Sequence, residues 1–151
     1  MRYLIGVGNY TAGDDAIGLR IVEEIVAKGL EDGFRAIDLS SNSLNLVSYL
    51  TPETEAILVV DAARMGLPPG EVRFFAPEDV ETRKVLAGVS THEDDLMKVL
   101  ELARLAGYTV PRLRIMGIEP GTVEPGAGLS QVIRDRTAAC ARAAIVELMS
   151  M

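Results

Sequence analysis

The chain has 151 residues and a formal net charge of −7, with 22 acidic residues, 15 Lys and Arg, and one histidine. This is the size of one domain, 1–151, that can bury about two-thirds of its unfolded surface. The negative charge and the absence of a basic run argue against nucleic acid or an anionic membrane surface as a partner. No apolar run reaches the roughly 18 residues of a membrane span, and we expect a cytoplasmic protein.

Hydrophobic patterning predicts alternating strands and helices along the chain. The wholly apolar run 56–60 is typical of a central parallel strand buried on both faces, whereas the partial alternation of 71–75 indicates a strand at a sheet edge. The alternation favours an α/β fold of three layers with a mostly parallel sheet. The predicted strands are 3–9, 34–39, 56–61, 71–75 and 113–118, and the predicted helices are 16–28, 40–49, 90–107 and 129–149, with 83–89 unassigned.

The junction between the first strand and the first helix is rich in glycine and carboxylate. Glycines at 6, 8 and 13 miss the spacing of a dinucleotide-binding turn, and Asp14 and Asp15 would repel a phosphate. A turn of this kind suits a cation better. We expect Asp14 to cap the helix, whereas for Asp15 a role at the helix start and a role as a ligand are both open.

Three potential ligands are expected at one edge of the sheet. Asp15 follows the first strand, Asp61 ends the third, and His92 begins a helix after the pattern Ser90-Thr91-His92-Glu93. Ligands in such folds gather at the carboxyl ends of the strands. Two carboxylates and one imidazole suit zinc, nickel or another borderline divalent ion, with a coordination position left open.

Other interpretations of these residues remain. His92 is the only imidazole in the chain, but a histidine in the first turn of a helix often only packs or caps there. A Ser90–His92 nucleophile lacks a G-x-S-x-G elbow, whereas an aspartic dyad of Asp15 and Asp61 stays open. Cys140 lies on a predicted stripe of small residues, which indicates core packing.

Four separated blocks of the sequence form a recognisable pattern: Gly6–Asn9 with Gly13–Gly18, Val60–Ala62 with 65–67 and 69–71, Ser90–His92, and Gly117–Pro120. Together they resemble the hydrogenase maturation endopeptidases, which trim the C-terminal extension from the large subunit of nickel–iron hydrogenases. The second block is similar to that of members serving formate-hydrogenlyase and coenzyme-linked hydrogenases. The resemblance implies a phosphorylase/hydrolase-like sandwich with a five-stranded, mostly parallel sheet and one antiparallel edge strand, here 71–75.

The resemblance also implies a site and a substrate. Asp15, Asp61 and His92 match the family's metal ligands, which recognise nickel already installed in the hydrogenase precursor. The nickel would position the scissile bond while Asp15 or Asp61 assists a water molecule as the catalytic carboxylate. Zinc or another divalent ion is a possible ligand of the free protein. We expect a monomer whose partner is the nickel–iron hydrogenase large-subunit precursor.

The chain departs from the family pattern at three places. Asp15 stands where many members have glutamate, which would draw a metal closer to the backbone. Leu39-Ser40 replaces a glycine pair after Asp38, which puts a backbone approach of substrate there in question. Glu119 stands where glutamine is common, and we expect it to add charge near a substrate groove.

Two further functions stay open at the level of sequence. A nickel-binding chaperone or docking module for hydrogenase assembly would use the same three ligands without hydrolysis. A small-molecule hydrolase on this kind of fold would need a closed pocket and further polar residues, which the sequence does not identify.

Overall fold

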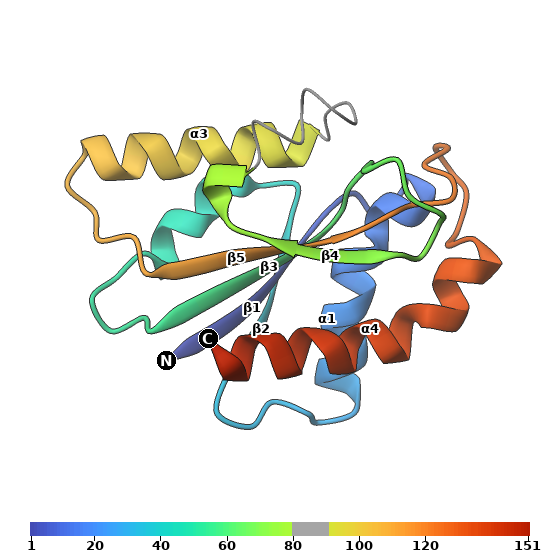
Figure 1. Cartoon of the computed structure of the whole chain (residues 1–151), viewed down its shortest axis with the longest axis horizontal. Helices are drawn as coiled ribbons and strands as arrows, with labels where there is room; N and C mark the ends of the chain where they lie inside the picture. Colours follow the sequence, from blue (N-terminus) through green and yellow to red (C-terminus); the bar gives the residue numbers. More distant parts are fainter. Residues whose placement is uncertain (80–90) are drawn as a thin grey trace.

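The computed structural model describes residues 1–79 and 91–151, with the side chains of 91–95 outside the description. Its centre is a five-stranded sheet in the order β2-β1-β3-β5-β4 (Figure 1). Strands β2, β1, β3 and β5 are parallel, and β4 pairs antiparallel with β5 at one edge. The predicted fold class is therefore confirmed, including the antiparallel edge strand. The bounds are β1 Arg2–Val7, β2 Arg35–Ser40, β3 Ala56–Ala62, β4 Val72–Phe75 and β5 Arg112–Ile118.

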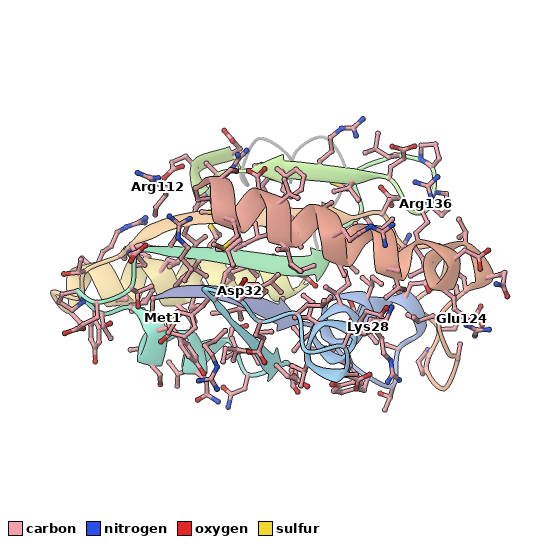
Figure 2. All side chains as sticks on the ribbon, turned by 90° about the horizontal axis from the view of Figure 1, so that it is seen from below. Met1, Lys28, Asp32, Arg112, Glu124 and Arg136 are labelled. Atoms are coloured by element: carbon pink, nitrogen blue, oxygen red, sulfur yellow. The ribbon has the colours of Figure 1, made fainter. Side chains whose placement is uncertain are left out.

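Helices cover both faces of the sheet. On one face α1 (Ile17–Ala27) and α4 (Gln131–Ser150) lie side by side, as both views show (Figures 1 and 2). On the other face α3 (Thr91–Leu105) packs with the 3₁₀ helix η2 (Ser43–Tyr49). Two shorter 3₁₀ turns complete the described elements, η1 (Gly13–Ala16) and η3 (Pro77–Asp79).

Strand β3 divides the hydrophobic core between the two faces. All seven of its residues are buried, as the apolar run predicted. Leu58 and Val60 belong to the core beneath α1 and α4, whereas Ile57 and Val59 belong to the core beneath α3 and η2. Because side chains alternate along a strand, Asp61 continues the row of Ile57 and Val59 and lies on the α3 side of the sheet.

Several predicted elements differ from the observed ones. The predicted helix 16–28 is confirmed as α1, which begins one residue later because Ala16 still belongs to the preceding 3₁₀ turn η1, whereas the segment predicted as a helix through Tyr49 forms a 3₁₀ helix rather than an α-helix. Val26 was placed on the buried face of its helix but is 51% exposed, whereas its neighbour Ile25 is fully buried. The unassigned segment 83–89 and Ser90 of the capping pattern lie outside the described residues.

Strand order reverses next to β1. The chain leaves β1 through α1 to reach β2 on one side, and then crosses by way of η2 to β3 on the other side. The carboxyl ends of β1 and β3 therefore form the topological switch point of the sheet, where ligands bind in open α/β folds. Within the described ranges, no helix combines the length and hydropathy needed to cross a bilayer.

Candidate active site

Asp61 lies at the carboxyl end of the central strand β3. It pairs in register with Gly117 of β5 and is 1% exposed. A carboxylate is costly to bury unless its surroundings compensate the charge, so an aspartate at the end of a wholly apolar strand marks a position with a specific task. The sequence predicted this placement at the strand end, and one more residue, Ala62, extends the strand beyond it.

Asp15 lies in η1, the turn that joins β1 to α1, and its side chain is partly exposed. Two glycines let this turn approach the sheet closely. A Cβ on Gly8 would collide with the Asp15 carbonyl oxygen, and one on Gly18 would collide with the Val60 carbonyl oxygen. The backbone at Asp15 therefore lies in close contact with the end of β1. The start of α1 likewise lies in close contact with β3 at Val60, one residue before Asp61.

Asp14 does not cap the helix that follows it, contrary to the sequence-based expectation. In the described chain, neither Ala12 at the start of η1 nor Ala16 at the start of α1 has a side-chain capping bond. Asp14 is instead fully buried and binds a segment more than 100 residues away. Its Oδ2 accepts hydrogen bonds from the N–H groups of Gly121 and Thr122 and the Ser130 hydroxyl, and its Oδ1 accepts one from the Ser130 N–H.

These four hydrogen bonds control the ionisation of Asp14. Burial alone would raise the pKa of the carboxyl, but the donors of Ser130, Thr122 and Gly121 outweigh it and hold the pKa below its usual value. Asp14 is thus held in its charged form by neutral donors. Its role is to attach the turn that carries Asp15 to the loop before α4.

Glu119 follows β5 and is 5% exposed, and the charge that it was expected to add near a substrate groove stays a prediction. Its Oε1 accepts hydrogen bonds from the N–H groups of Met65 at 2.6 Å and Leu67 at 3.0 Å. Both donors lie in the loop that follows Asp61. The sequence signal for this contact was weak, because the partners are more than 50 residues apart.

His92 is the second residue of α3, and its side chain lies outside the description. Helix α3 precedes β5 and runs back along the sheet, so its first turn lies at the edge where the parallel strands end (Figure 1). His92 belongs to that first turn, and Asp61 lies on the face of the sheet that α3 covers, by the alternation of side chains along β3. Among described side chains alone, no group of three potential metal ligands forms, and the predicted trio stays a prediction.

A cluster at the end of β2 was not predicted as part of the site. The Tyr10 hydroxyl donates a hydrogen bond to Asp38, and the Arg20 guanidinium lies 5.0 Å from the centre of the Tyr10 ring. Desolvation, followed by the hydrogen bonds to Asp38 and Glu23, raises the pKa of Tyr10 well above its usual range. The sequence offered no periodicity that would pair these residues.

Ser40 adopts the backbone conformation that glycine favours. Its φ of 52° lies in the left-handed region, and the Asp38 carboxylate accepts hydrogen bonds from its N–H and its hydroxyl. Its carbonyl oxygen in turn accepts the Gly8 N–H at 3.0 Å. The Leu39-Ser40 departure thus keeps a glycine-like backbone at this position, which is part of a register shift between β1 and β2.

The site as described brings two acidic segments together. Asp15 is within reach of solvent, and Asp61 is buried at the switch point, with the first turn of α3 at the same edge. Carboxylate oxygens can bind a divalent cation or accept a proton from water. Either chemistry would be carried out at the carboxyl ends of β1 and β3.

Comparison with known proteins identifies the family to which the chain belongs. The HycI model, described as hydrogenase maturation protease, matches residues 19–147. The chain belongs to the hydrogenase maturation protease family. The matched range contains Asp61 and His92, and Asp15 lies shortly before it.

Individual relatives agree with this membership. The chain is 29% identical over 137 residues to the hydrogenase expression/formation protein HupD of Bradyrhizobium diazoefficiens, covering 89% of this chain and 71% of HupD. It is 29% identical over 138 residues to the hydrogenase 2 maturation protease of Escherichia coli, covering 88% of this chain and 82% of that protease. In structure it is similar to the maturating endopeptidase HybD of E. coli, with a TM-score of 0.81 over 99% of this chain and 93% of HybD; at 24% identity this likeness concerns the fold.

Proposed function

We propose that this protein is an endopeptidase that removes the C-terminal extension of a nickel–iron hydrogenase large-subunit precursor after nickel insertion. Membership of the hydrogenase maturation protease family supports the reaction class. The observation that carries the site is the buried Asp61 at the end of β3, beside the turn that carries Asp15, at the switch point of the sheet. Asp15, Asp61 and His92 would bind the nickel of the substrate.

The division of labour between the two carboxylates follows from their exposure. Hydrolysis of an amide requires a water to lose a proton as it attacks the carbonyl carbon, and the departing nitrogen to gain one as the C–N bond breaks. Asp15 is partly exposed and can reach such a water, whereas Asp61 is almost fully buried and suits a fixed ligand. Nickel bound to both would hold the nearby scissile bond in place.

This assignment has a consequence for the free protein. Three ligands from the protein leave the coordination sphere of a divalent ion open, to be completed by the substrate. The free protein should then bind zinc or nickel weakly and exchangeably. We further propose that the protein is a monomer and that it acts in the cytoplasm.

The deciding experiment compares nickel-loaded and nickel-free precursor of the large subunit from the same organism. Each is incubated with the purified protein, and the C-terminus of the subunit is analysed by mass spectrometry. Shortening of the nickel-loaded form alone is the expected result. Binding without shortening of either form would refute the protease and leave a docking module, and equal shortening of both forms would refute recognition through nickel.

A further inference from the structure

We propose that Asp14 and Glu119 are positioning residues that hold Asp15 and Asp61 in their working geometry by attaching both to one short segment, residues 119–122. We call these four residues the anchor segment. The inference rests on the proposed function for its catalytic consequence. Its structural part concerns hydrogen bonds that can be measured whether or not the protein cleaves a precursor.

Glu119 holds the loop that follows Asp61 at several points. Its side chain accepts the N–H groups of Met65 and Leu67, its backbone carbonyl accepts the Gly70 N–H at 2.8 Å, and its own N–H donates to the Glu71 carbonyl at 2.9 Å. The loop therefore folds around a single residue. Backbone N–H groups in a loop need such partners, and a buried carboxylate supplies a strong acceptor.

Asp14 holds the opposite side of the site to the same segment. Its carboxylate accepts the N–H groups of Gly121 and Thr122 at 2.8 and 3.0 Å, and its own N–H donates to the Thr122 carbonyl at 2.7 Å. A Cβ on Gly13 would also collide with the Thr122 carbonyl oxygen, which shows how closely the two backbones approach. Asp15 is the next residue in the chain, so its placement depends on this contact.

The two attachments are coupled through a stiff connection. Glu119 and Gly121 are separated by Pro120, which is buried and whose ring fixes its φ. Ala63 lies two residues after Asp61, and its N–H donates a hydrogen bond of 2.9 Å to the carbonyl of Ile118, the residue before the anchor segment. A shift of the anchor segment would therefore move the surroundings of Asp15 and of Asp61 together.

The two carboxylates use their oxygens differently, and this makes the proposal testable. The bonds from Met65 and Leu67 both reach Oε1 of Glu119, so glutamine can keep them through its amide oxygen. Asp14 accepts donors on both oxygens, so asparagine would place an NH₂ group against the N–H of Ser130 or against three other donors. Glu119→Gln is thus expected to keep both hydrogen bonds. Glu119→Leu removes the acceptor and replaces it with a side chain of similar volume.

The experiment compares wild type, Glu119→Gln and Glu119→Leu by three measurements. These are urea unfolding, amide hydrogen exchange at Met65 and Leu67, and the kcat and KM of cleavage of nickel-loaded precursor. We expect Glu119→Gln to stay within about threefold of wild type in exchange and kcat. Glu119→Leu should lose protection at both amides and lower kcat about 10- to 100-fold with little change in KM, because misplacement of about 1 Å can cost about 100-fold in rate.

If Glu119→Leu does not fold, a second pair of variants with smaller changes tests the proposal. Ser130→Ala removes only the hydroxyl that donates to Asp14 at 2.6 Å, and Ser150→Ala removes a hydroxyl at the far end of α4. We expect kcat to be several-fold lower in Ser130→Ala than in wild type. In Ser150→Ala we expect kcat to be unchanged. Equal rates in both variants would overturn the contribution of Asp14.

Two results would overturn the role of Glu119. One is wild-type kcat in Glu119→Leu despite lost amide protection, and the other is an equal loss in Glu119→Gln, which would make the charge rather than the acceptor responsible.

If wild type itself cleaves no precursor, the proposed function fails separately. The positioning is then decided by the NMR shifts of the Asp15 and Asp61 amides, which should change in Glu119→Leu and not in Glu119→Gln; unchanged shifts in both would overturn it.

Discussion

Gly18 of α1 lies against the carbonyl oxygen of Val60, the residue immediately before Asp61 in β3. No side chain fits between them, since a Cβ at position 18 would also collide with the Val7 carbonyl oxygen. The distance between the helix that follows Asp15 and the strand that carries Asp61 is therefore set by backbone contact. This contact makes Gly18 a structural determinant of the site, although glycine has no side chain that could take part in the chemistry.

Replacing Gly18 by alanine should loosen this contact. Both obstructing atoms belong to backbone and cannot rotate away, so we expect a loss of about 1–3 kcal/mol in the free energy of unfolding, the usual cost of overpacking. Urea unfolding measures it. Gly128→Ala is the matched control, because a Cβ there meets no atom within 4 Å. Equal stabilities of the two variants would contradict the packing argument.

Asp61 and His92, the proposed metal ligands, should be essential for processing but not for folding. We expect Asp61→Asn and His92→Ala each to reduce cleavage of nickel-loaded precursor by at least about 100-fold, since a metal-positioned bond loses its orientation when a ligand is removed. Mass spectrometry of the precursor measures the rate, and circular dichroism checks the fold. Glu124→Gln, at an exposed loop position labelled in Figure 2, should cleave like wild type. Wild-type rates in either ligand variant would refute the site.

Asp14 should make the stability of the protein depend on pH. Its folded-state pKa is lowered, so its contribution is present above the unfolded-state pKa of about 3.9 and is lost as pH falls through the lower, folded-state value. We expect Asp14→Asn to cost about 1–3 kcal/mol at pH 7, the usual cost of leaving buried donors unsatisfied. The difference from wild type should shrink below about pH 4. A difference that is constant between pH 7 and pH 3 would contradict this origin.

Cys140 should be chemically inert in the folded protein. It is 4% exposed within α4, as its stripe of small neighbours predicted, and burial raises the pKa of the thiol although Arg136 opposes the shift. Because only the thiolate reacts rapidly, we expect alkylation by iodoacetamide at pH 8 to be at least about 100-fold slower in native protein than in urea. Mass spectrometry follows the labelling. Equal rates in the two conditions would show that the thiol is accessible.

The sequence by itself determined the fold class and the strand ends at which the acidic residues lie. Strand β3 was predicted from a wholly apolar run ending in Asp61, and the edge position of β4 from its partial alternation. Helix α4 and the burial of Cys140 followed from the spacing of small and apolar residues. These features are local, because strand and helix periodicities repeat within a few residues.

Only the tertiary structure decided what Asp14, Glu119 and Gly18 do. The sequence predicted a helix cap for Asp14 and, for Glu119, only added charge near a substrate groove, because neighbours in the chain are the only partners that a local pattern can indicate. Their actual donors lie more than 50 residues away, and the sheet order brings them together. A buried carboxylate takes whichever donors the fold presents to it, and that pairing is settled when the strands assemble.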